Sequence, residues 1–182
     1  MPGRTQREEE KRFGERMRLE AMAVRFPHVE KHPNRVTFEG VLTMVNTASD
    51  KAPAGARGHR VVLTKEAAES ALPSLLGMGV DFRPDWDGHD ARRKIGVLTE
   101  ADLVGNSLTV RGFLYARDFP EAATAIEAQS PGALGMSYEL ADARVEDMRA
   151  EIWRLTRVTF TGAAILLREK AAYQATSIRM AS

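Results

Sequence analysis

Two short segments of the chain place a reactive side chain beside a glycine. His89 lies between Gly88 and Asp90, and Ser137 stands in the run Leu-Gly-Met-Ser-Tyr-Glu at 134–139. A histidine that takes a proton and a serine that attacks a carbonyl are the two groups that a serine hydrolase requires. Neither segment is specific alone, because histidines in loops and serines in apolar strands are common structural residues. Together they make acyl transfer the first hypothesis.

The elements that must position these side chains are mostly short strands. Ser137 falls in a predicted strand at 134–140, and His89 follows the apolar start of a segment at 80–83. Runs rich in β-branched and aromatic residues predict the other strands, and cap residues with prolines bound the helices. Further strands are predicted at 36–45, 61–63, 94–98, 107–115 and 152–161, and helices at 65–76 and 120–128. Strands that follow one another without regular helices predict an α+β fold with a small, mainly antiparallel β-barrel flanked by helices.

Length, composition and charge narrow the classes of protein to consider. The chain has 182 residues, of which 43% are hydrophobic and 28% charged, as in ordinary globular domains. Its formal net charge of +1 does not favour nucleic acid as a partner. No cysteine is present, which excludes disulfides and cysteine-ligated zinc. No run of residues is apolar enough to predict a membrane span or a signal peptide, and we expect a cytosolic protein.

We expect three regions along the chain. The first, 1–33, is a charged arm whose apolar residues Phe13, Met17, Ala21 and Val24 have helical spacing, followed by a proline-bounded connector. This arm is either a solvated leader helix or a docking segment. The second, 34–172, is the body that holds the predicted barrel, and the third, 173–182, is a C-terminal tail.

The body resembles the prohead (capsid maturation) proteases of tailed bacteriophages, which are related to the herpesvirus assemblins. The resemblance rests on loose motifs that occur in the right order, and it extends over about 36–172. The matching segments are 38–41, 88–90, 94–97, 108–114, 134–139 and 155–164.

This resemblance implies a fold, an activity and a biological setting. The fold would be the small β-barrel flanked by helices, with His89 as general base and Ser137 as nucleophile. The enzyme would be a serine protease that cleaves scaffold and major capsid protein precursors inside the procapsid, in the host cytoplasm. It would act as a homodimer, process itself, for instance near 171–172, and need no cofactor or metal. Neither nucleic acid nor a membrane would be a partner.

The third catalytic position departs from the family pattern. The family usually has an acidic residue or a histidine on the strand after the serine, where this sequence has Arg157. Arginine is always cationic and accepts no hydrogen bond, so it cannot orient a histidine. Glu139 is the main substitute, because residues two apart on a strand share a face, and Asp90 is a further candidate. Alternatively Arg157 pairs with Glu139 as a structural residue, or our register on this strand is shifted.

The sequence also offers candidates for the oxyanion donor and for the walls of a peptide groove. Backbone N–H groups near Ser137, or the side chain of Arg168, are candidates for stabilising the oxyanion. The loop at 46–58 and the acidic segment at 81–90 are candidate walls of a peptide groove. Two other interpretations compete with a protease: a catalytically inactive structural or scaffolding protein of the same fold, and an unrelated β-barrel binding module.

Overall fold

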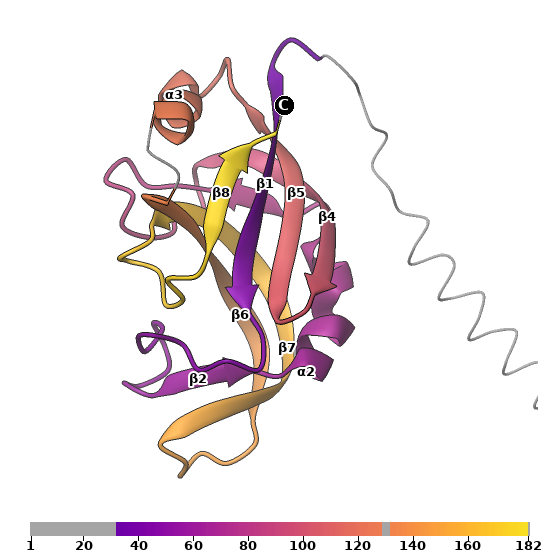
Figure 1. The fold of residues 1–182 in the computed structure, drawn as a ribbon, viewed down its shortest axis with the longest axis vertical. Helices are drawn as coiled ribbons and strands as arrows, with labels where there is room; N and C mark the ends of the chain where they lie inside the picture. Colours follow the sequence, from indigo (N-terminus) through magenta and orange to yellow (C-terminus); the bar gives the residue numbers. More distant parts are fainter. Residues whose placement is uncertain (1–31, 129–131, 182) are drawn as a thin grey trace, which may run out of the picture.

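The computed structural model describes residues 32–128 and 132–181 (Figure 1). The predicted helix of the N-terminal arm lies outside these residues. No helix in the described part is both long and apolar enough to cross a membrane.

A single curled sheet of eight strands forms the body (Figure 1). Its strands are β1 (Arg35–Met44), β2 (Arg60–Leu63), β3 (Gly79–Asp81), β4 (Lys94–Val104), β5 (Ser107–Tyr115), β6 (Leu134–Val145), β7 (Ile152–Leu167) and β8 (Ser177–Met180). They lie in the order β2-β7-β3-β4-β5-β1-β8, and β6 pairs with β7. All pairs of strands are antiparallel except β2–β7 and β3–β7. The predicted α+β class with a mainly antiparallel sheet is therefore confirmed.

The sheet curls toward a barrel but is not shown to close. In the described residues no ladder joins β6 to β8, so these strands remain edges of the sheet. A side chain crosses the gap instead: the Thr176 hydroxyl accepts a hydrogen bond from the backbone N–H of Met136 at 3.2 Å and donates one to the carbonyl of Tyr173 at 3.0 Å. The prediction of a mainly antiparallel sheet is thus confirmed, whereas closure into a barrel is not shown in the described residues.

Strand β7 is the longest element and organises the sheet. It pairs with β2 near its start, with β3 near its end, and with β6 along most of its length. Its end contains Gly162, Ala163 and Ala164, all buried. Small residues at these positions leave room for side chains of neighbouring strands to lie across β7.

Two helices and one 3₁₀ turn complete the body: α2 (Lys65–Ala71), η1 (Leu72–Leu75) and α3 (Pro120–Ala128). The Thr64 hydroxyl caps α2 by accepting from the backbone N–H of Ala67 at 3.3 Å. The helix predicted over 65–76 ends early as η1, because Pro73 cannot continue an α-helical hydrogen-bond ladder. Buried alanines of α2 pack it closely against the sheet.

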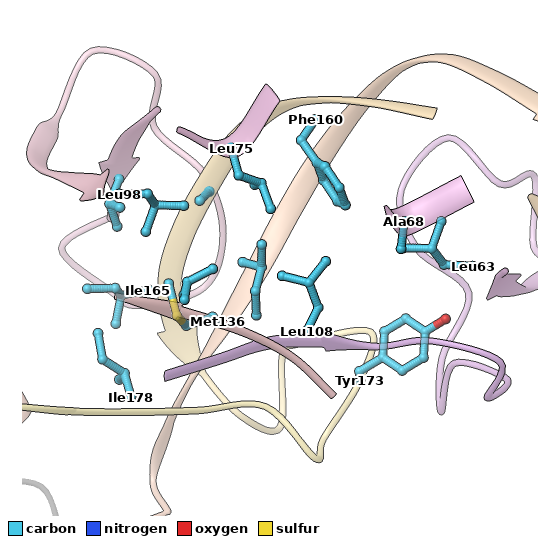
Figure 2. Close-up of a cluster of buried hydrophobic side chains, with 14 of the residues drawn as sticks. Leu63, Ala68, Leu75, Leu98, Leu108, Met136, Phe160, Ile165, Tyr173 and Ile178 are labelled. Atoms are coloured by element: carbon cyan, nitrogen blue, oxygen red, sulfur yellow. The ribbon is translucent and has the colours of Figure 1, made fainter. Parts of the chain in front are cut away.

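The hydrophobic core lies inside the curve of the sheet (Figure 2). Met136 and Ile165, which face each other across β6 and β7, both point into this core. Residues next to them on the two strands therefore point to the opposite face. This opposite face carries the candidate site.

The C-terminal segment belongs to the body. Tyr173 is 3% exposed, and the carbonyl oxygens of Val61 and Thr47 lie 3.0 and 3.2 Å from its hydroxyl, which has one proton to donate. Strand β8 then pairs with β1. We expected a tail over 173–182, but Tyr173, Thr176 and Ile178 are buried, and β8 extends the sheet. Strand β8 was not predicted because four residues form too short a pattern.

The hydrogen bonds of Thr176 predict a measurable contribution to stability. Thr176→Val keeps the shape of the side chain but leaves the buried N–H of Met136 without a partner, which should cost about 1–3 kcal/mol. Urea unfolding measures this loss. Thr156→Val is the matched control: Thr156 is exposed, so its loss should be below about 0.5 kcal/mol. Equal losses in the two variants would contradict the bridging role.

Candidate active site

Ser137 lies on the outer face of β6, near its N-terminal end. The alternation of strand side chains puts Gly135 and Glu139 on the same face, opposite to Met136. Across the ladder Ser137 is paired with Ala164 and Glu139 with Gly162. Directly across the ladder, the serine and Glu139 therefore both face small residues of β7.

Ala164 also aligns Ser137 with a residue on the other side of β7. On that side Ala164 is paired with Asp81 of β3. Paired residues of adjacent strands share a face, so Ser137, Ala164 and Asp81 form a row across three strands. At a strand spacing of about 4.8 Å, this row places the Cα atoms of Ser137 and Asp81 about 10 Å apart. An imidazole fits between them.

The loop between β3 and β4 brings His89 onto this row. Its fold depends on Trp86, which adopts a left-handed backbone with φ 55°. The Trp86 carbonyl accepts a hydrogen bond from the backbone N–H of Leu167 at 2.8 Å, and its indole packs on Phe82 with ring centroids 4.9 Å apart. The hydrogen bond fastens the loop to the end of β7, and the aromatic contact fastens it to the residue after β3. A strained backbone at a non-glycine residue persists only where surrounding contacts hold it.

The turn after His89 directs Asp90 away from the imidazole. The Asp90 carboxylate accepts from the backbone N–H of Arg92 at 3.0 Å and lies 3.6 Å from the Nε of Arg93. Its own backbone N–H donates to Oδ1 of Asp81 at 3.0 Å. Asp90 thus shapes the loop, and its carboxylate is not placed on the histidine.

The His89 imidazole lies between two carboxylates. Its Nδ1 is 3.7 Å from Oδ1 of Asp81 and 3.8 Å from Oε1 of Glu139. Because these acids come from β3 and β6, which flank the end of β7, the ring spans the stretch of β7 that holds Gly162 and Ala164. Within the described residues, neither ring nitrogen has a hydrogen-bond partner, and both are buried.

Burial dominates the electrostatics of His89. It lowers the pKa of the imidazole below the ordinary 6.5, and the nearby cations Lys94 and Arg83 lower it further. Glu139 and then Asp81 oppose this by favouring the imidazolium, but the net direction is downward. His89 is therefore neutral at pH 7, the form that can accept a proton from a serine hydroxyl.

Ser137, His89 and Glu139 line one groove with a volume of about 840 Å³. Both segments expected as walls contribute to its lining, through residues 51–57 and residues 87–89. Apolar side chains continue the groove along the β6–β7 hairpin; they are Leu140, Ala143, Val145, Met148, Trp153 and Leu155. A groove of this size and lining suits an extended chain with apolar side chains.

Arg157 lies elsewhere. It is paired with Arg144 across the β6–β7 ladder, seven positions before Ala164. At about 3.4 Å per residue this puts Arg157 more than about 20 Å from the row that holds Ser137. The ladder pairs Glu139 with Gly162, so the alternative pairing of Arg157 with Glu139 is wrong. Arg157 is no member of the site, and its charge does not bear on His89.

Arg168 follows β7 directly and lies close to the serine strand. Its Nε donates to the carbonyl of Gln174 at 2.8 Å, and a second nitrogen donates to the carbonyl of Gly132 at 3.1 Å. Its Cγ covers the face of Gly135 that Ser137 shares. The guanidinium therefore fixes the loops beside the serine. From this position it remains a candidate hydrogen-bond donor to the oxyanion.

Asp81 is a site residue that we did not single out from the sequence. We had assigned it only to a groove wall within 81–90. Its signal is an aspartate between the apolar residues Val80 and Phe82, which marks a carboxylate inside a buried strand.

No three His, Asp or Glu side chains among residues 32–128 and 132–181 form a metal-binding group.

The lowered pKa of His89 predicts how stability varies with pH. As pH falls below 6.5, the unfolded chain binds a proton at this residue before the folded protein does, so folding stability decreases. In His89→Gln this part of the pH dependence is absent. Urea unfolding between about pH 7.5 and pH 5 should therefore show a smaller loss of stability in the variant than in the wild type. An NMR titration that places the His89 pKa at or above 6.5 would contradict this.

Comparison with known proteins shows a similarity in the fold. No protein-family model and no curated protein matches the sequence. A solved structure of the bacteriophage T4 capsid assembly protease is similar, with a TM-score of 0.50 and 13% sequence identity, over 77% of this chain and 87% of that chain.

A second solved structure belongs to KSHV protease in complex with a hexapeptide phosphonate inhibitor. It is 11% identical with a TM-score of 0.49, over 81% of this chain and 65% of that chain. The chain thus has the fold of the capsid assembly protease of bacteriophage T4.

Proposed function

We propose that this protein is a serine endopeptidase with Ser137 as nucleophile and His89 as general base. One observation carries the proposal: a half-buried histidine, whose two ring nitrogens are buried and whose Nδ1 lies between two carboxylates, lines the same groove as Ser137. The likeness of its fold to the T4 capsid assembly protease supports the same activity.

The chemistry follows from the placement of the two groups. As Oγ of Ser137 attacks the scissile carbonyl, Nε2 of His89 takes its proton and the carbonyl electrons move to oxygen. The imidazolium then gives this proton to the leaving amine, and water repeats the sequence to release the acyl group. Carboxylates beside Nδ1 stabilise the imidazolium. Backbone N–H groups near Ser137 or the Arg168 guanidinium are the proposed oxyanion donors.

The groove suits an extended peptide. Consecutive residues 137–140 of β6 line it, so the strand presents its edge there as well as its side chains. Among the described strands β6 pairs only with β7, which leaves that edge open to a peptide strand. We propose scaffold and major capsid protein precursors of a phage as the substrates, cleaved inside the procapsid in the host cytoplasm by a homodimer.

Self-processing is part of this proposal, but the fold restricts where it can occur. Ala171 is 1% exposed, and the carbonyl of Ala172 accepts hydrogen bonds from the backbone N–H groups of Asp50 and Lys51. Cleavage at 171–172 would therefore require the C-terminal segment, with β8, to leave the body first.

A catalytically inactive structural or scaffolding protein of the same fold is the second candidate. The observation that favours it is the Nε2 atom of His89, which is buried and has no hydrogen-bond partner among the described residues, Ser137 included. Arg157, which suggested inactivity in the sequence, no longer supports it because that residue lies far from the site.

Labelling with a fluorophosphonate probe separates the two candidates. We expect the probe to modify Ser137, located by mass spectrometry of the labelled peptide. Ser137→Ala should abolish labelling, and His89→Ala should slow it by at least about 10³-fold, because the hydroxyl then lacks its base. Ser70→Ala, at an exposed serine of α2, is the control and should label at the wild-type rate.

Two outcomes would overturn the proposal. One is a folded wild-type protein that remains unlabelled, which would favour the inactive structural protein. The other is labelling at Ser137 that is unaffected by His89→Ala, which would show a serine reacting without the histidine.

A further inference from the structure

The carboxylate of Asp81 is fully buried, at 0% exposure. A buried charge of this kind destabilises a fold unless hydrogen bonds and an opposite charge compensate it. Both oxygens are in fact engaged: Oδ1 accepts from the backbone N–H of Asp90 at 3.0 Å, and Oδ2 accepts from Nζ of Lys94 at 2.7 Å. Asp81 is therefore held in one orientation.

The remaining acceptor capacity of Asp81 faces His89. A carboxylate oxygen has two lone pairs, and only one of those on Oδ1 is used, by the N–H of Asp90. The second is free for the Nδ1–H of His89, 3.7 Å away. A small rotation of the imidazole would turn this contact into a hydrogen bond.

Glu139, the other carboxylate at Nδ1, is held less firmly. Its side chain is 48% exposed, whereas that of Asp81 is 0% exposed. Solvent competes for an exposed carboxylate and weakens its interactions. Glu139 also has one more rotatable bond than Asp81, so fixing it to the imidazole loses more conformational entropy.

We propose that Asp81 on β3, and not Glu139, is the positioning residue that orients His89. It accepts the Nδ1–H, which leaves Nε2 unprotonated and free to take the proton of Ser137, and it stabilises the imidazolium that results. Lys94 holds the other oxygen of Asp81, Oδ2, through its hydrogen bond at 2.7 Å. The chemical purpose of this inference rests on the proposed function, whereas the contacts of Asp81 do not depend on that function.

The tautomer of neutral His89 tests the proposal directly. We would record ¹⁵N NMR spectra of the imidazole at about pH 8, where His89 is neutral because its pKa is lowered. The wild type should carry its proton on Nδ1. Glu139→Gln, the matched control at the exposed carboxylate, should keep it there. Asp81→Asn should move the proton to Nε2, in whole or in part, because the amide can donate to Nδ1.

Probe labelling gives a second readout of the same variants. Asp81→Asn should slow labelling of Ser137 by about 10²–10⁴-fold, since the base is in the wrong tautomer. Glu139→Gln should slow it by less than about tenfold, as expected for an exposed charge. Should Asp81→Asn fail to fold, the double variant Asp81→Asn/Lys94→Met removes the ion pair as a whole and takes its place.

Each result decides for or against Asp81. A tautomer that changes in Glu139→Gln while it persists in Asp81→Asn or in the double variant would overturn the proposal and assign the role to Glu139. A folded Glu139→Gln that keeps the proton on Nδ1, while Asp81→Asn or the double variant loses it, supports Asp81, because among the described residues these two carboxylates lie within 4 Å of Nδ1. If the wild type is never labelled but shows the expected tautomers, the proposed peptidase function fails while the role of Asp81 stands.

Discussion

The candidate site depends on small side chains in β7, which leave room for an imidazole to lie across the strand. Strand β7 separates the serine strand β6 from β3, and His89 must span it to reach carboxylates on both sides. Gly162 and Ala164 make this possible, because a larger side chain at either position would occupy the space above the strand. At Gly162 even a methyl group would meet the Glu139 carboxylate. The alignment of Ser137, Ala164 and Asp81 in one row then follows from ladder register alone.

Electrostatic effects of opposite sign are balanced around the imidazole. Burial and two cations disfavour its charged form, whereas Glu139 and Asp81 favour it. The net result is a histidine that is neutral at rest but has carboxylates in place for the moment when it takes up a proton. This is the condition that general base catalysis by histidine requires. The loop that carries His89 is fastened to β7 through Trp86, so the imidazole is held in place relative to these charges.

The sequence predicted the local elements better than their assembly. β-Branched runs located most strands, and Thr64 predicted the start of α2. The helix gives way to η1, which contains Pro73, before the predicted end at residue 76. His89 and Ser137 were also found from their local context, and the structure places them in one groove. Strand β8 was missed because four residues give too short a pattern, and its pairing with β1 depends on tertiary contacts. Arg157 was placed in the site because the length of β7 and the bulges in its ladder with β6 cannot be counted from sequence. Asp81 escaped notice for a related reason, since only the parallel pairing of β3 with β7 brings it to His89.

The central claim is that His89 activates Ser137 from its place across β7. A crystal structure of the protein after reaction with a peptide phosphonate tests this most directly. We predict a covalent bond from phosphorus to Oγ of Ser137, with Nε2 of His89 within about 3 Å of a phosphonate oxygen or of Oγ. We also expect the Nδ1 of His89 to face Asp81. A phosphonate bound to another residue, or an adduct at Ser137 with His89 turned out of the groove, would contradict the account.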